Sequence, residues 1–202
     1  MPDADESAWL GAIETAAPDV VAGWRALDSS YSGLRALRRE LRARVHDGDA
    51  ERILAQQDAM GDALEAMLRD LPDELLRAPG GEEDWNVAQA FAHATAARRF
   101  LAAWAALDAA WEWPEDDPPS VTPSVPVPAD ATREQLLTLL DKSRRSLQQS
   151  AARIAGHETQ RCRMRHPLVG RLRCGDWLLF VGIHDLMHLE QLHDLRSRAA
   201  HA

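Results

Sequence analysis

Residues 176–198 read DWLLFVGIHDLMHLEQLHDLRSR, and the spacing within this stretch points to the fold. His184 and His188 lie four positions apart, which places two side chains one above the other on a helix. Large apolar side chains share or border that helical stripe, namely Trp177, Phe180, Val181, Met187, Leu192 and Leu195. We therefore predict a buried helix whose two imidazoles point toward the interior of a helical bundle.

Three further long helices are predicted upstream of this one. Residues 50–71 and 132–156 carry apolar positions at helical spacing, and residues 86–111 are apolar on most sides, which predicts burial. Ala, Leu, Glu and Arg dominate the composition, and no stretch alternates apolar and polar residues for long enough to indicate a strand. Residues 156–175 are interpreted as an arginine-rich loop. We expect an all-α protein built on a four-helix bundle, without a sheet.

Two connections organise the chain. Residues 114–128 contain six prolines and are predicted to form an extended crossover, long enough to cross the end of a bundle or to run its full length. The sequence HDGD at residues 46–49 interrupts the helical pattern before it. This interruption predicts an N-terminal helical extension at residues 1–49 and a bundle domain at residues 50–198.

Composition argues against two broad classes of function. The formal charge of −9 disfavours nucleic-acid binding, because that binding depends on Lys and Arg along the phosphates. The longest apolar runs are far shorter than the roughly 20 residues that span a bilayer, so no membrane segment is expected. The acidic N-terminal sequence lacks the features of a secretory signal, and the expected location is the cytoplasm. Cys162 and Cys174 are too few for a disulfide framework and are expected to be ordinary thiols.

His93 adds a third histidine to the pair on the last helix. It lies in the buried helix at residues 86–111, where Ala96 and Ala97 on the same face leave room around a ring. Three neutral imidazoles can bind one divalent metal ion and leave a coordination position open. Two alternatives stay open: the spacing can arise by chance among eight histidines, or buried imidazoles can simply be hydrogen-bonded.

Other candidates are weaker than the three histidines. Gln191, one turn after His188, can orient that imidazole through a hydrogen bond, or it can merely satisfy a local one. Trp85 is expected to pack at the start of its helix, and His166 is expected to belong to a structural turn. Solvent-exposed positions are expected at Asp185, Arg98, Arg99 and His193. The alternatives are that Asp185 is a metal ligand and that Arg98 and Arg99 bind a carboxylate-bearing substrate.

The predicted loop before the last helix concentrates arginine. Such a cluster can recognise an anionic thiol or substrate, although charge balance in an acidic protein is the simpler interpretation. Its members are Arg161, Arg163, Arg165, Arg171 and Arg173.

Two segments resemble the DinB/YfiT-like superfamily. Residues 84–93, DWNVAQAFAH, look like the family's opening motif W-[ST]-V-x-E-x-x-x-H. Residues 166–170, HPLVG, together with WLLF at 177–180 and the pattern H-x-x-x-H-x-x-Q at 184–191, are similar to its closing motif. The motifs occur in the expected order on the expected helices, and the resemblance covers roughly residues 50–198.

The resemblance implies a four-helix bundle in which three histidines hold a divalent metal, most often zinc or nickel. Carried over residue by residue, the ligands are His93, His184 and His188. Asn86 and Gln89 depart from the Ser or Thr and the Glu that are frequent in the family, but neither change removes a ligand. Family members frequently pair as dimers, so a homodimer is also implied.

The resemblance further implies a kind of chemistry. Several relatives are thiol-dependent S-transferases that use bacillithiol, mycothiol or glutathione, one branch isomerises maleylpyruvate, and many have no assigned activity. The corresponding hypothesis is a metal-dependent enzyme that activates a low-molecular-weight thiol or water for transfer to a small electrophilic substrate. The alternatives are a noncatalytic metal-binding stress-response bundle, and a helical module that binds a protein through residues 1–49 and the proline segment.

Overall fold

Helices make up most of the structure, a computed structural model that describes residues 4–27, 30–80, 85–116, 127–166 and 169–200. The helices are α1 Ala4–Ala16, α2 Pro18–Ala26, α3 Tyr31–Arg44, α4 Ala50–Asp70, α5 Val87–Ala109, α6 Arg133–Ile154 and α7 Cys174–Ala200, with a 3-10 helix η1 at Asp73–Arg77. The predicted all-α class is confirmed. Within the described ranges, no helix is both long enough and apolar enough to cross a membrane.

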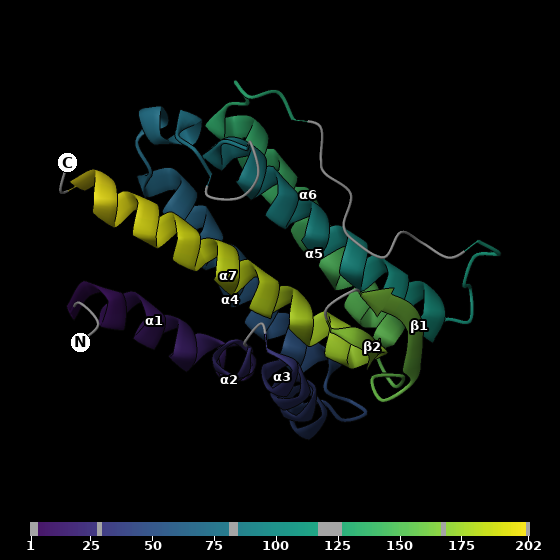
Figure 1. Ribbon diagram of the computed structural model, residues 1–202. Helices are drawn as coiled ribbons and strands as arrows, with labels where there is room; N and C mark the ends of the chain where they lie inside the picture. The colour runs from purple at the N-terminus through teal and green to yellow at the C-terminus, as the bar shows by residue number, and fades with distance from the viewer. Residues whose placement is uncertain (1–3, 28–29, 81–84, 117–126, 167–168, 201–202) are drawn as a thin grey trace.

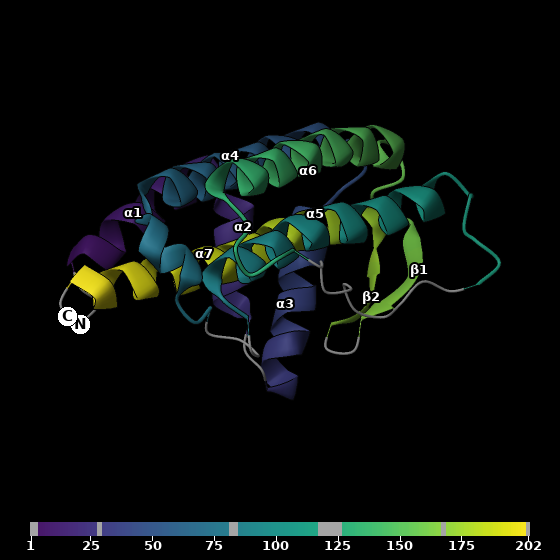
Figure 2. The same ribbon diagram turned by 90° about the horizontal axis from the view of Figure 1, so that it is seen from above.

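The four long helices α4, α5, α6 and α7 form the bundle (Figure 1). Helix α5 packs against α6 and α7, and α4 packs against the same two helices, as the view from above also shows (Figure 2). Asn86 Nδ2, at the start of α5, donates a hydrogen bond to the carbonyl oxygen of Ala129 just before α6, at 2.7 Å. At the other end, Arg153 of α6 pairs with Glu112 beyond α5. Helices α5 and α6 therefore run in the same direction.

This direction fixes where the two described ends of the proline-rich segment lie. Because α5 and α6 are parallel, the two ends of the segment lie at opposite ends of the bundle, as a course along the full length requires. Residues 117–126 of this segment lie outside the described residues. Helix α7 runs antiparallel to α5 (Figure 1), so residues near the start of α5 face the second half of α7.

Side-chain caps define where two bundle helices begin. The Asn86 side chain accepts a hydrogen bond from the Gln89 backbone N–H at 3.0 Å, and the Gln89 side chain accepts one from the Asn86 N–H at 3.2 Å. Asn86 thus performs the capping for which Ser or Thr is usual in the family. The same reciprocal pair joins Thr132 and Gln135 at the start of α6, where the sequence has the spacing of a capping box.

The N-terminal helices share one hydrophobic core with the bundle. Helix α2 lies so close to α7 that a Cβ atom on Gly182 would come within 2.7 Å of Cγ2 of Val20. Leu37 and Leu41 of α3 are fully buried in the same core. The division of the chain near residue 50 stays a prediction, and the shared core means that the two parts support each other's packing.

The expectation that residues 156–175 form a loop without a sheet is wrong. Strands β1 Arg161–His166 and β2 Gly170–Arg173 form a short antiparallel hairpin. Cys162, Met164 and Leu172 face the core. The alternation of buried and exposed residues spans only a few positions in each strand, which is too short for periodicity alone to reveal.

Candidate metal centre

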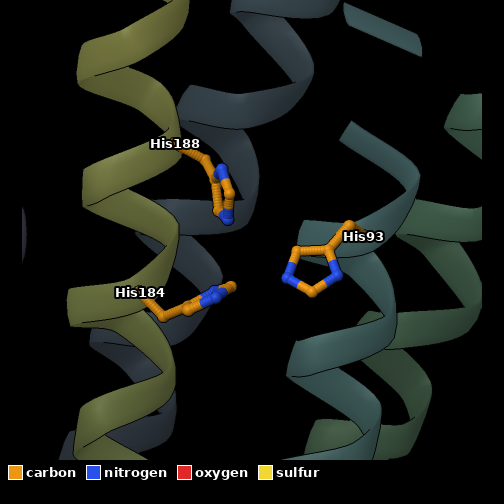
Figure 3. Close-up of side chains that lie close together, drawn as sticks. All are labelled: His93, His184 and His188. Carbon is orange, nitrogen blue, oxygen red and sulfur yellow. The ribbon is translucent and has the colours of Figure 1, made fainter. Parts of the chain in front are cut away.

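His93 on α5 and His184 and His188 on α7 lie together, as the sequence predicted (Figure 3). Their ring centroids are 5.6 Å apart for His93 and His184, 5.7 Å for His93 and His188, and 4.6 Å for the pair on α7. One ring nitrogen from each residue lies within 4.8 Å of the other two. Zinc–nitrogen bonds of about 2.0–2.1 Å in a tetrahedral site require nitrogens about 3.4 Å apart. Small side-chain rotations therefore suffice to bring one nitrogen of each ring within bonding distance of a single ion.

Burial keeps the imidazole of His184 suited to metal binding. His188 is only 7% exposed, while His93 and His184 are half-buried. Burial lowers the pKa of His184 well below its usual value, and the neighbouring rings of His188 and His93 lower it further. The His184 ring is therefore neutral at pH 7 and has a lone pair to offer. Its Nδ1 atom is buried and has no hydrogen-bond partner among the described residues.

Gln191 makes the contact that the sequence suggested. Its Oε1 atom lies 3.0 Å from Nδ1 of His188. The amide oxygen can only accept, so the imidazole in this arrangement is the tautomer that donates from Nδ1. In this tautomer the Nε2 atom of His188 is the unprotonated nitrogen, which is the arrangement that metal-binding histidines need.

Aromatic side chains frame the three histidines. The Trp85 ring lies 5.0 Å from that of His93, so this residue packs beside the site as well as at the start of α5. One turn before His184, Phe180 contacts the rings of Trp177 at 5.7 Å and His166 at 6.2 Å. Trp85 therefore packs directly beside the site, and both His93 and His184 stay partly exposed.

The predicted exposure of Asp185 and Arg98 is wrong. Both side chains are fully buried and form an ion pair inside the bundle. Burial raises the pKa of Asp185 to about 6, and Arg98 opposes part of that rise. The error arose because helices α2, α4 and α5 all pack against α7, so the face of α7 that carries Asp185 lies inside the bundle. Arg99, the next residue, is exposed as expected.

His193 also differs from its predicted exposure. Its ring is half-buried and stacks on that of Trp9 from α1, with centroids 4.1 Å apart and planes 12° from parallel. The burial comes from α1, whose position beside α7 could not be read from the spacing on α7 itself. His193 does not belong to the group of three histidines.

The arginine cluster lies on the hairpin and is partly paired. Arg163 binds Asp108 and Arg173 binds Asp176, each with a nitrogen–oxygen distance of 2.7 Å. Both contacts agree with the charge-balancing interpretation. His166 is the last residue of β1, directly before the turn of the hairpin.

A second group of possible ligands was not foreseen. Asp108, Cys162 and Cys174 are buried, and their ligand atoms lie within 4.8 Å of one another. Both cysteines are free thiols, as expected. A hydrogen bond with Cys174, followed by burial, raises the pKa of Cys162, and Asp108 already accepts two hydrogen bonds from Arg163. These contacts explain the proximity of the three side chains as ordinary packing inside the core.

Fold and site together define a helical-bundle protein with a candidate three-histidine metal centre. The family model of the DinB superfamily matches residues 56–192, and the chain belongs to that family. The matched range contains His93, His184, His188 and Gln191. No curated protein and no solved structure matches the chain.

Proposed function

We propose that His93, His184 and His188 hold one divalent metal ion, zinc or nickel. The observation that carries this proposal is the convergence of three imidazoles from α5 and α7, one of which has a buried nitrogen without a partner. An unsatisfied buried polar atom costs about 1–3 kcal/mol, and a metal ion would remove that penalty if it bound this nitrogen. The three histidines therefore fit a divalent metal ion.

We further propose that the centre belongs to an enzyme that transfers a low-molecular-weight thiol, such as mycothiol or bacillithiol, or water to a small electrophile. The metal would supply a Lewis acid that lowers the pKa of a thiol or water. Three protein ligands leave room for such a group, whereas structural zinc sites have four protein ligands.

The chain's own residues have separate tasks in this scheme. Gln191 orients the His188 ring through their hydrogen bond. Trp85, packed against the ring of His93, would shield that side of the site from bulk water, which strengthens electrostatic interactions there. His93 and His184 are partly exposed, and a small molecule would approach the site from that side.

The test combines metal loading with turnover. Protein without a histidine tag is reconstituted with zinc or nickel and assayed with mycothiol, bacillithiol or glutathione against a small chloronitroarene. We expect thioether formation by the loaded wild type and by His157→Ala, whose histidine is exposed and far from the group in sequence. His184→Ala should lose both metal and turnover. Metal binding without any turnover would favour the noncatalytic alternative.

A further inference from the structure

One buried guanidinium contacts all four helices of the bundle. Arg98 of α5 forms an ion pair with Asp185 of α7, and both side chains are fully buried. The Nε atom of Arg98 donates to Oγ of Ser143 on α6 at 3.1 Å, and Nη2 donates to the carbonyl oxygen of Gln57 on α4 at 3.2 Å. Arg98 is therefore the polar centre at which α4, α5, α6 and α7 meet.

This polar centre lies next to the three histidines along both helices. Asp185 directly follows His184 and precedes His188 by three residues, so its carboxylate is anchored between the two imidazoles along α7. Arg98 follows His93 by five residues, about 7.5 Å along the axis of α5. The ion pair therefore joins the same two helices that carry the histidines, on the interior side of the site.

The position of His93 relative to the other two rings depends on how α5 and α7 are aligned. A shift of one residue moves a helix by about 1.5 Å and turns its side chains by about 100°. Many buried residues of α5 are small and interchangeable, among them Ala94, Ala97, Ala102 and Ala105, so beside the larger Phe91 and Leu101 a polar contact adds specificity to this alignment. An ion pair with additional hydrogen bonds is satisfied in one alignment only.

Stability alone does not explain a charged pair in this position. Apolar residues of similar volume often stabilise a core as well as a buried ion pair or better, because they avoid the cost of desolvating two charges. The best-attested role of buried polar groups is to select one register among several. Asp185 also keeps one carboxylate oxygen without a hydrogen-bond partner among the described residues, which a purely stabilising pair would satisfy.

We propose that Arg98 and Asp185 are positioning residues whose ion pair aligns α5 with α7 and so holds His93 opposite His184 and His188. The consequence for metal binding rests on the proposed function. The three rings lie opposite one another in the chain without metal, so their arrangement can be measured independently of metal binding.

The test replaces the pair by apolar residues of similar size, in the double variant Arg98→Met with Asp185→Leu. We expect this full-length variant to fold with a thermal midpoint equal to or above that of the wild type. Nuclear Overhauser contacts between the imidazole protons of His93 and His188 should weaken or disappear in the metal-free protein. Contacts between His184 and His188 should persist, because both residues lie on α7. Affinity for zinc should fall at least tenfold.

A matched control removes another buried carboxylate that does not join α5 to α7. Asp19 pairs with Arg44 and Arg52 between α2, α3 and α4. Asp19→Asn should lower stability but keep the imidazole contacts and the zinc affinity. If the double variant does not fold, Arg98→Lys and Arg98→Gln replace it, and only the lysine variant should retain the contacts.

The inference is overturned if the apolar double variant keeps both the His93–His188 contacts and its zinc affinity, or if Arg98→Lys and Arg98→Gln behave alike. A wild type that shows the imidazole contacts but binds no zinc or nickel would contradict the proposed function instead. The contacts in the double variant would still decide the positioning role in that case.

Discussion

His188 is oriented by Gln191, whose Oε1 atom lies 3.0 Å from Nδ1 of the imidazole, one turn further along α7. This contact ties the ring to its own helix and directs Nε2 toward the space shared with His93 and His184. The role of Gln191 can therefore be separated from that of a ligand, because its removal leaves three imidazoles in place.

Gln191→Leu should weaken metal binding without abolishing it. Loss of a hydrogen bond behind a metal-binding histidine typically reduces affinity about 10–100-fold. Competition titration with a chromophoric chelator measures the change, and the exposed Asp194→Asn on the same helix serves as the control. Unchanged affinity in Gln191→Leu would show that the contact only satisfies a local hydrogen bond.

Gly182→Ala should destabilise the packing of α2 on α7. The added Cβ would lie 2.7 Å from Cγ2 of Val20 and 2.9 Å from the side-chain amide of Gln57, closer than van der Waals contact allows. Overpacking of this kind costs about 1–3 kcal/mol, which urea unfolding can measure.

Gly11→Ala is the matched control for this substitution. Gly11 lies in the middle of α1, and an added Cβ would meet no atom within 4 Å. The same chemical change should therefore be neutral or stabilise the chain by up to about 1 kcal/mol. Similar losses at both positions would argue against the close contact between α2 and α7.

Asp19 should make stability depend on pH in the acid range. Burial alone would raise its pKa, but hydrogen bonds from Gln56, Arg52 and Arg44 outweigh burial and lower the pKa below the ordinary value of 3.8. A carboxyl group with a lowered pKa stabilises the fold above its unfolded-state pKa. This contribution is lost as pH falls through the lowered value.

Asp19→Asn is therefore expected to reduce the free energy of unfolding by about 1–3 kcal/mol at neutral pH. The difference from the wild type should shrink as pH falls below 3.8, where the wild-type carboxyl also becomes neutral. Urea unfolding across this range provides the measurement, with the exposed Asp130→Asn as the control. A difference that stays constant with pH would contradict the ionic role of Asp19.

Deletion of residues 1–49 should leave a chain that binds metal but unfolds more easily. All three histidines lie downstream of the deletion, whereas Val20, Leu37 and Leu41 belong to the shared core. We expect a lower thermal midpoint and an unchanged metal content per folded chain, measured by calorimetry and elemental analysis. A truncated protein that is folded yet binds no metal would contradict the proposed boundary.

The helices and the histidine group were accessible from the sequence because their signals are local. The spacing of His184 and His188 defines a shared helical face, and the Thr132–Gln135 pattern marks a helix start whatever the chain packs against. The position of His93 opposite that face followed from the expectation that both helices are buried in one bundle.

Other features depend on contacts between elements that are distant in sequence. Asp185 and Arg98 look like solvated charges on their own helices, and only the packing of four helices around them makes each the partner of the other. Trp9 and His193 meet because α1 lies beside α7, an arrangement that no periodicity predicts. The hairpin escaped detection because its two strands are short and their alternation is brief.

Metal content per folded chain tests the proposed centre most directly. After reconstitution with zinc or nickel, elemental analysis should find about one ion per chain in the wild type and in His157→Ala. His93→Ala, His184→Ala and His188→Ala should each bind far less, because each loses one of three ligands. A wild type that retains no metal, or a His93→Ala variant that binds metal as tightly as the wild type, would contradict the three-histidine assignment.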